Sequence, residues 1–256
     1  MSTPMKTIFL CEDTPDGIYT AIYDAWASRL GHDNVKLVIN GEDNLELFAQ
    51  YREVNTDYEK AVKVARSVQM KISGEAYHMM YKAVMSDQPD KADAAYRFLI
   101  DGFKYGARIV NMLGNPSVAR IFELNRKVSG EQHLFVEFIR FIELNNGILL
   151  GKIAPKCNVV PLVAPHFADR FSGENWMIYD ENRRLAAVHE SGRPWVLMDT
   201  KGTEWEALCE KTENEDVYVT LWKIFHRTIA IKERENPACQ RNHMPLWYRK
   251  NMTEFL

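Results

Sequence analysis

Three side chains, His133, Glu137 and His166, are the strongest candidates for chemistry in this sequence. In an extended chain Glu131, His133 and Glu137 share one face, because alternate residues of a strand point the same way. An imidazole beside two carboxylates can transfer protons or hold a hard or borderline metal ion. These residues alternate with apolar ones, so a solvated or helix-covered sheet face is the simpler interpretation.

His166 is followed by Asp169 and Arg170, three and four residues later, which places all three on one face of a short helix. An Asp–Arg structural pair with a capping histidine is the alternative to a catalytic role for His166. We therefore leave open whether the protein is an enzyme.

A second group of residues has the types that grip an unpaired base and its phosphate. Trp176 and Tyr179 offer stacking surface, and Arg183 offers a cation beside Asp180. The alternative places the aromatic residues in the core and makes Asp180 and Arg183 turn residues. The sequence does not separate the two interpretations.

The segment from Trp222 to Lys250 is locally basic, with only Glu233 and Glu235 as acids. Arginine presents a fork that matches two phosphate oxygens, although a salt-bridged helix surface would use the same residues. The candidate nucleic-acid-binding residues of the whole chain are Arg140, Arg170, Trp176, Tyr179, Arg183, Arg227, Arg234, Asn236, Arg241 and Arg249.

Composition excludes several classes of protein. The 256 residues carry a formal net charge of −3, so any binding to nucleic acid must use a local basic patch. The four cysteines are far apart and form no zinc or iron–sulfur motif, and we expect no metal and no cofactor. Hydrolase and zinc-deaminase signatures are missing. Without a signal peptide or a membrane span, we expect a soluble protein of the cytoplasm that does not bind membranes.

The stretch 128–184 is central to the predicted fold. From Glu131 to Leu144 the alternation of polar and apolar residues predicts a strand that buries one face, with Asn145-Asn146-Gly147 as a tight hairpin turn and 148–154 as the returning strand. The predicted buried face consists of Leu134, Val136, Phe138 and Ile142. A helical interpretation survives, because Leu134, Phe138, Phe141 and Ile142 also share a helix face.

The N-terminal region opens with a strand (Lys6–Cys11), a helix that Gly31 stops, and a second strand (Val35–Ile39). The turn Glu12–Gly17 has three carboxylates and one glycine, which would repel a phosphate, so we reject a Rossmann or P-loop fold. Three or four amphipathic helices are predicted in 56–125.

After the hairpin, prolines disfavour a strand in 158–165, and residues 166–171 read as one or two helical turns. Strands are predicted at 176–180, 185–189 and 195–198, and a long helix from Asn214 that Pro237 ends. The predicted fold is α+β: an antiparallel curved sheet at about 131–198, an N-terminal helical region and a basic C-terminal helical segment. The two parts, 1–127 and 128–256, are expected to pack as one continuous unit.

Four segments together resemble an uncharacterised bacterial family usually labelled probable DNA metabolism protein. They are EQHLFVEFIRF, PHFADRF, WMIYDENR and LWKIFHRTIAIKERENPACQRNHMPLWYRKNMTEF, in that order, and the opening FLCEDTPDGIYTAIYDAW looks similar as well. The resemblance implies a neighbouring radical-SAM protein that acts in DNA repair or modification, and in some members a fusion to a uracil-DNA-glycosylase-like domain. It brings no established reaction.

From the resemblance and the basic C-terminal segment we expect a nucleic-acid-binding component of DNA repair or modification, which acts with the radical-SAM partner on single-stranded or damaged DNA. One alternative is a stand-alone enzyme on nucleic acid or nucleotide that uses His133, Glu137 and His166. Another is a protein–protein adaptor.

Overall fold

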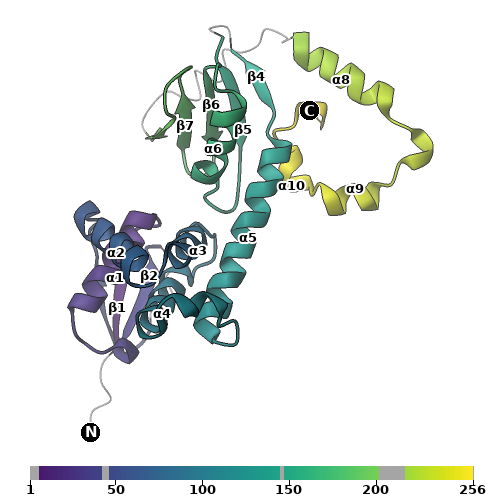
Figure 1. Cartoon of the computed structure of the whole chain (residues 1–256). Helices are drawn as coiled ribbons and strands as arrows, with labels where there is room; N and C mark the ends of the chain where they lie inside the picture. The colour runs from purple at the N-terminus through teal and green to yellow at the C-terminus, as the bar shows by residue number, and fades with distance from the viewer. Residues whose placement is uncertain (1–5, 42–45, 145–146, 202–216, 256) are drawn as a thin grey trace. The chain divides into compact units, whose positions relative to one another are not determined.

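The computed structural model describes residues 6–41, 46–144, 147–201 and 217–255 (Figure 1). By its backbone contacts the chain divides into an N-terminal unit, Met1–Ser129, and a C-terminal unit, Gly130–Leu256. Helix α5 (Pro116–Phe138) contributes to both units. No helix in the described part of the chain is both long and apolar enough to cross a membrane.

The N-terminal unit contains a three-stranded parallel sheet of order β2-β1-β3. Its elements are β1 (Lys6–Cys11), α1 (Pro15–Ala27), η1 (His32–Asn34), β2 (Val35–Ile39) and β3 (Ala49–Glu53). The predicted strand-helix-strand order is confirmed, and the Thr14 hydroxyl caps α1 by accepting a hydrogen bond from the Gly17 amide at 3.0 Å. Strand β3 was not predicted, because its mostly exposed residues lack a buried apolar face.

Helix α1 ends at Ala27, before the predicted stop at Gly31. Arg29 takes a left-handed backbone conformation with φ of 54°, and Gly31 follows with φ of 84°. The chain therefore leaves the helix through two positive-φ residues, of which only Gly31 is a glycine.

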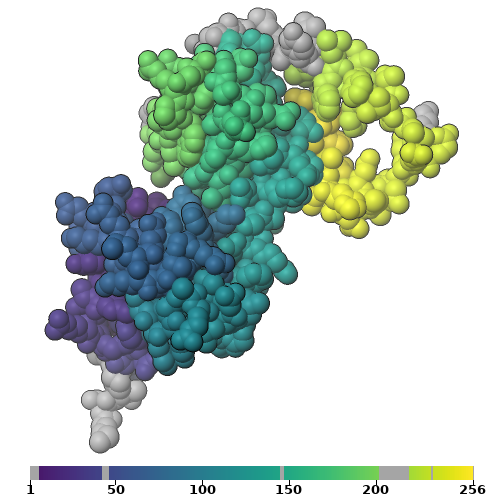
Figure 2. Space-filling model, viewed as in Figure 1, coloured from purple at the N-terminus to yellow at the C-terminus, as the bar shows by residue number. Residues whose placement is uncertain are grey.

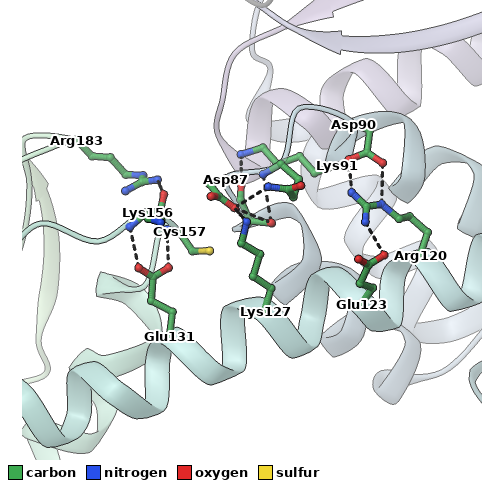
Figure 3. Close-up of polar contacts among 12 residues, drawn as sticks. Asp87, Asp90, Lys91, Arg120, Glu123, Lys127, Glu131, Lys156, Cys157 and Arg183 are labelled. Atoms are coloured by element: carbon green, nitrogen blue, oxygen red, sulfur yellow. Dashed lines mark hydrogen bonds and ion pairs between the residues drawn. The ribbon is translucent and has the colours of Figure 1, made fainter. Parts of the chain in front are cut away.

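Four α-helices follow, as predicted, and they cover residues from Tyr58 onward. They are α2 (Tyr58–Lys71), α3 (Gly74–Val84), α4 (Lys91–Tyr105) with the short η2 (Gly106–Asn111), and α5. Asp57 and Ser73 cap α2 and α3 with their side-chain oxygens. Arg120 on α5 binds both carboxylate oxygens of Asp90 at 2.7 Å and also Glu123 (Figure 3). This ion-pair group ties the start of α4 to α5.

The predicted strand from Glu131 to Phe138 is wrong, because α5 continues through it to Phe138. The buried residues there are Glu131, Phe135 and Ile139, which are four apart, while Phe138 of the predicted face is only half-buried. The apolar stripe begins further upstream with the buried residues Val118, Ile121, Leu124 and Val128. Its helical period carries on into the segment that alternation alone had assigned to a strand.

The C-terminal unit has a five-stranded sheet of order β4-β5-β6-β7-β8. The strands are β4 (Phe141–Glu143), β5 (Leu149–Ile153), β6 (Trp176–Asp180), β7 (Leu185–His189) and β8 (Val196–Asp199). Three of the pairs are antiparallel, but β5 and β6 are parallel, so the sheet is mixed and the prediction of an antiparallel sheet is wrong at this pair. Asn145 and Asn146 of the predicted turn lie outside the described residues.

Helix α6 (Val160–Arg170) explains the parallel pair, because it is the crossover that connects β5 to β6. It begins six residues before the predicted turns at His166. Pro161 lies in its first turn, where a missing N–H costs nothing, and Pro165 is accommodated inside the helix.

The chain then forms a series of short helices that end near the C-terminus. They are α8 (Val217–Ile229), η3 (Lys232–Arg234), α9 (Pro237–His243), α10 (Leu246–Arg249) and η4 (Thr253–Phe255). Pro237 was expected to end the long helix, but α8 stops at Ile229 and Pro237 opens α9, where Asn236 is the N-cap. The predicted helix start at Asn214 lies outside the described residues.

Candidate nucleic-acid interface

A groove of about 690 Å³ lies in the C-terminal unit, where the end of α5, strand β4, helix α8 and η4 come together. Its lining combines one cation, one carboxylate and several apolar side chains. They are Glu137, Arg140, Phe141, Val219, Leu221, Trp222, Phe225 and Thr253. Two of the residues that the sequence suggested, Glu137 and Arg140, therefore lie at one groove.

Arg140 is anchored inside the unit by a residue far along the chain. Its Nη2 donates to the Glu254 carboxylate at 2.8 Å, and its Nε donates to the same group at 3.2 Å. The guanidinium also lies 5.7 Å from the centre of the Trp222 ring. Arg140 therefore positions Trp222 and Glu254, and it is less free to bind a phosphate than an unpaired arginine.

The pKa of Glu254 reflects this arrangement. Its side chain is only 3% exposed, and burial by itself would raise the pKa of the carboxyl. Hydrogen bonds from Arg140 and from the Trp222 side chain favour the charged form, so the net result is a pKa lowered from 4.5. Glu254 is therefore a charged anchor for the groove at neutral pH.

Trp222 and Phe225 are the exposed aromatic residues of the groove, at 39% and 53%. Their ring centres are 5.9 Å apart and their planes are tilted by 33°. Neither Trp222 nor Phe225 is among the candidate binding residues that the sequence suggested. The signal that indicates them is the mixture of aromatic and basic residues in LWKIFHR, which suits an exposed helix face better than a core.

The three candidate catalytic residues are not assembled into one site. His133 Nε2 lies 3.2 Å from Glu137 Oε1 in an exposed pair one helical turn apart on α5. His166 is exposed on α6, where its ring packs against Phe167 at 5.1 Å. Within the described residues, no hydrogen bond or ion pair joins His166 to the His133–Glu137 pair. The geometry is that of a surface pair and gives no support to joint acid–base catalysis.

Glu131 does not belong to the predicted trio either. Its buried carboxylate accepts hydrogen bonds from the main-chain amides of Lys156 at 2.8 Å and Cys157 at 2.7 Å (Figure 3). A helix places Glu131 and His133 on different sides, whereas the predicted strand placed them together. No group of three or more His, Cys, Asp or Glu side chains able to hold a metal is found within the ranges that the structure describes.

Trp176 and Tyr179 are buried in the C-terminal unit, so the structure favours the core alternative over the stacking role for both residues. Trp176 is 0% exposed and stacks on His189 with ring centres 5.1 Å apart and planes 9° apart. Tyr179 is also buried. Their burial leaves little ring surface for a base to stack on, and both residues lie on β6, the central strand of the sheet.

Asp180 and Arg183 form an internal turn and not a phosphate contact. Arg183 Nη1 lies 3.2 Å from the buried carboxylate of Asp180, and the guanidinium also donates to the carbonyls of Pro155 and Lys156. Burial raises the pKa of Asp180 and outweighs the opposite effect of Arg183. The sequence had left this interpretation open, and the geometry favours it.

The remaining candidate nucleic-acid-binding residues differ in how exposed they are and in what they contact. Arg227, Arg234 and Arg241 are exposed on α8, η3 and α9, and no acidic partner is found for them among the residues described. The segment that carries them is coloured yellow-green to yellow in Figure 2. Arg249 packs over the Phe255 ring at 4.7 Å, and Asn236 caps α9 by accepting from the Cys239 amide at 3.0 Å. Arg170 is exposed and lies 5.6 Å from the centre of the Phe171 ring.

The two units, each of mixed helix and sheet, define an α+β protein, and the C-terminal unit contains the groove that Trp222 and Phe225 line. A family model described as a domain of unknown function, DUF4130, matches residues 89–254. The chain belongs to this family.

Other comparisons add no function. No curated protein matches the chain. Among solved structures, a chain described as a DHH-domain member of the s1p family of ribosomal proteins has 13% identity and a TM-score of 0.27, with 74% of each chain covered. This similarity is too low to assign a fold or an activity.

Proposed function

We propose that the protein is a nucleic-acid-binding component of DNA repair or modification, and that its C-terminal unit binds single-stranded DNA. The observation that carries the proposal is that the segment 222–241 exposes two aromatic rings, Trp222 and Phe225, and three arginines, Arg227, Arg234 and Arg241, that have no acidic partner among the described residues. Successive unpaired bases stack on aromatic side chains, and arginine forks contact the phosphates between them.

Charge supports this choice of surface. The chain as a whole has a net charge of −3, so the attraction for a polyanion has to be local. The guanidinium groups of Arg140 and Arg183 form ion pairs with carboxylates inside the unit. The arginines of α8, η3 and α9 have no such partner within the described ranges, so they keep their hydrogen-bond donors for a ligand.

The proposed process, DNA repair or modification, and the proposed radical-SAM partner rest on the family resemblance described in the sequence analysis. The resemblance implies a neighbouring radical-SAM protein, so we propose that this chain presents DNA to such a partner. Co-purification from native cells tests this part separately, because DNA binding by the isolated chain does not depend on it.

The test of binding is a fluorescence-anisotropy titration of a labelled single-stranded oligonucleotide at several salt concentrations. We expect each of Arg227→Glu, Arg234→Glu and Arg241→Glu to weaken binding and to reduce the salt dependence by about 0.7 counterion. Phe225→Ala should weaken binding by about 1 to 3 kcal/mol with an unchanged salt slope. Arg66→Glu is the charge-matched control, since Arg66 is exposed on α2 in the other unit.

Binding that is absent at low salt, both with and without the partner protein, would contradict the proposal. The same holds if Arg66→Glu lowers affinity as much as the three C-terminal variants do. In that case the attraction is general and does not use this surface.

A protein–protein adaptor is the second candidate, favoured by apolar side chains that the C-terminal unit exposes. Val196, Leu197 and Met198 are all exposed on β8, which is an edge strand. Exposed apolar edge strands are sites at which another chain adds a strand. If partner capture is lost on Leu197→Lys while DNA binding is absent in every variant, the adaptor function is the better conclusion.

A further inference from the structure

The N-terminal unit contains a hollow that lies outside the surface discussed so far. Its volume is about 560 Å³, and it is bordered by α1, α2 and α4. That size is within the range of small-molecule sites, about 300 to 1,000 Å³. The side chains that line it are Ile22, Tyr23, Trp26, Ala27, Arg29, Lys63, Val64, Ser67, Lys71, Leu99 and Phe103.

The base of the hollow is apolar and partly aromatic. Ile22, Val64 and Leu99 are buried. Trp26 meets Phe103 edge to face, with ring centres 5.3 Å apart, and Phe103 is exposed. A flat ring can therefore lie against aromatic and aliphatic carbon here, as heteroaromatic ligands do in protein pockets.

Three cations, and no carboxylate, are among the lining residues. Arg29, Lys63 and Lys71 are all exposed, and within the described part of the chain none of them forms an ion pair. Asp24, an acid on α1, is already paired with Lys60 at 2.8 Å. Three unneutralised positive charges in a protein of net charge −3 form a local site for a dianion.

Arg29 is held in a backbone conformation that a non-glycine residue rarely adopts, with φ of 54°. Glycine would have this conformation without strain, as Gly31 does two residues later. Strained residues of this kind are concentrated at ligand sites, where the surrounding structure holds them. The backbone thus carries a long cationic side chain at the one turn that borders the hollow.

We propose that this hollow is a binding site for a nucleotide, with the base against Trp26 and Phe103 and the phosphate held by Arg29, Lys63 and Lys71. The Ser67 hydroxyl, which also lines the hollow, supplies a further hydrogen-bond donor. The site belongs to the N-terminal unit and does not depend on DNA binding by α8 and α9.

The test uses the full chain and 2′-deoxyadenosine 5′-monophosphate, with calorimetry at low salt. We expect saturable binding of this nucleotide, and at least tenfold weaker binding of both deoxyadenosine and ribose 5-phosphate, because each lacks one half of the recognised group. Equal binding of ribose 5-phosphate would overturn the aromatic part of the proposal. No binding of the nucleotide at millimolar concentration would overturn all of it.

Arg29→Gly is the most informative variant. It removes the guanidinium and relieves the backbone strain, so we expect an equal or higher melting temperature together with about tenfold weaker nucleotide binding. Lys63→Ala with Lys71→Ala should weaken binding by at least as much. Arg66→Ala is the matched control, because Arg66 is exposed on the same helix but does not line the hollow. Nucleotide affinity that is unchanged in Arg29→Gly and in the double lysine variant would overturn the site.

One further arm distinguishes a free nucleotide from the end of a DNA strand. A 5′-phosphorylated oligonucleotide competes with the mononucleotide if a strand terminus enters the hollow, and the same oligonucleotide without the phosphate competes less well. Competition that requires the 5′-phosphate of the oligonucleotide assigns the strand end as the ligand. Failure of the oligonucleotide to compete assigns the free nucleotide.

Discussion

Arginine residues of one chemical type have different roles in the C-terminal unit. Arg140 is joined to Glu254, 114 positions along the chain, and Arg183 is joined to Asp180 and to main-chain carbonyls. Arg227 and Arg241 are exposed without an acidic partner among the described residues. The difference lies in their tertiary neighbours, so residue type alone did not separate anchoring arginines from available ones.

Glu254 gives a pH-dependent prediction at this scale. Its pKa is lowered in the folded state from 4.5, so its contribution to stability is fully present above about pH 4.5 and is lost as pH falls through the lower folded value. We expect Glu254→Gln to lower the free energy of unfolding by about 1 to 3 kcal/mol at pH 7, because Arg140 then loses its charged partner.

The measurement is urea unfolding of the wild type and of Glu254→Gln at pH 7 and at about pH 3. The stability difference between the two proteins should be smaller at the lower pH, because protonation of Glu254 removes the charge that the glutamine variant also lacks. A difference of the same size at both values would show that the charge of Glu254 does not stabilise the fold. The comparison removes the effects of all other carboxyl groups, which the two proteins share.

At the scale of elements, the register of helix α5 determines which of its aromatic side chains are buried against the C-terminal segment. It buries Phe135 and leaves Phe138 half-buried, and both rings meet Tyr248 of α10, with centres 5.0 and 5.5 Å away. Burial is the main cause that raises the pKa of Tyr248, to about 12. Tyr248 of the C-terminal segment therefore packs against one face of α5 that contains both Phe135 and Phe138, which a strand would have turned to opposite sides.

We expect Phe135→Ala to cost about 3 to 5 kcal/mol of stability, as truncation of a buried aromatic residue does, and Phe138→Ala to cost clearly less. Thermal or urea unfolding of the two variants checks this order. The strand register predicted from alternation requires the reverse order, with the larger loss at Phe138. The two variants remove the same number of atoms only three positions apart, so each is the control for the other.

At the scale of the whole molecule, the cysteines and histidines are dispersed. Cys11 and Cys157 are buried in different units and Cys239 is exposed. We expect purified protein to carry no stoichiometric iron or zinc, because its cysteines lack the spacing of a ligand set. Elemental analysis of protein prepared without chelators checks this, and one metal per chain would make His133 and His166 candidate ligands.

Local signals in the sequence determined the elements that depend on near neighbours. The strands Lys6–Cys11 and Val35–Ile39 have the predicted bounds, and the strands from Trp176 and Leu185 are where the pattern indicates. These features depend on hydrogen bonds and side-chain periods within a few residues. These local signals can therefore be recognised from the sequence without knowledge of the tertiary structure.

Three features became clear only from the tertiary structure. They are the helical conformation of residues 131–138, the parallel pairing of β5 with β6, and the set of residues that line the groove. Alternation in 131–138 fits a strand, but the apolar stripe of α5 already runs at helical spacing from Val118. Trp176 is enclosed while Trp222 is exposed, although both are aromatic residues beside polar ones. Burial depends on elements far away in the sequence, and a pattern read within one segment contains no information about which of them will cover it.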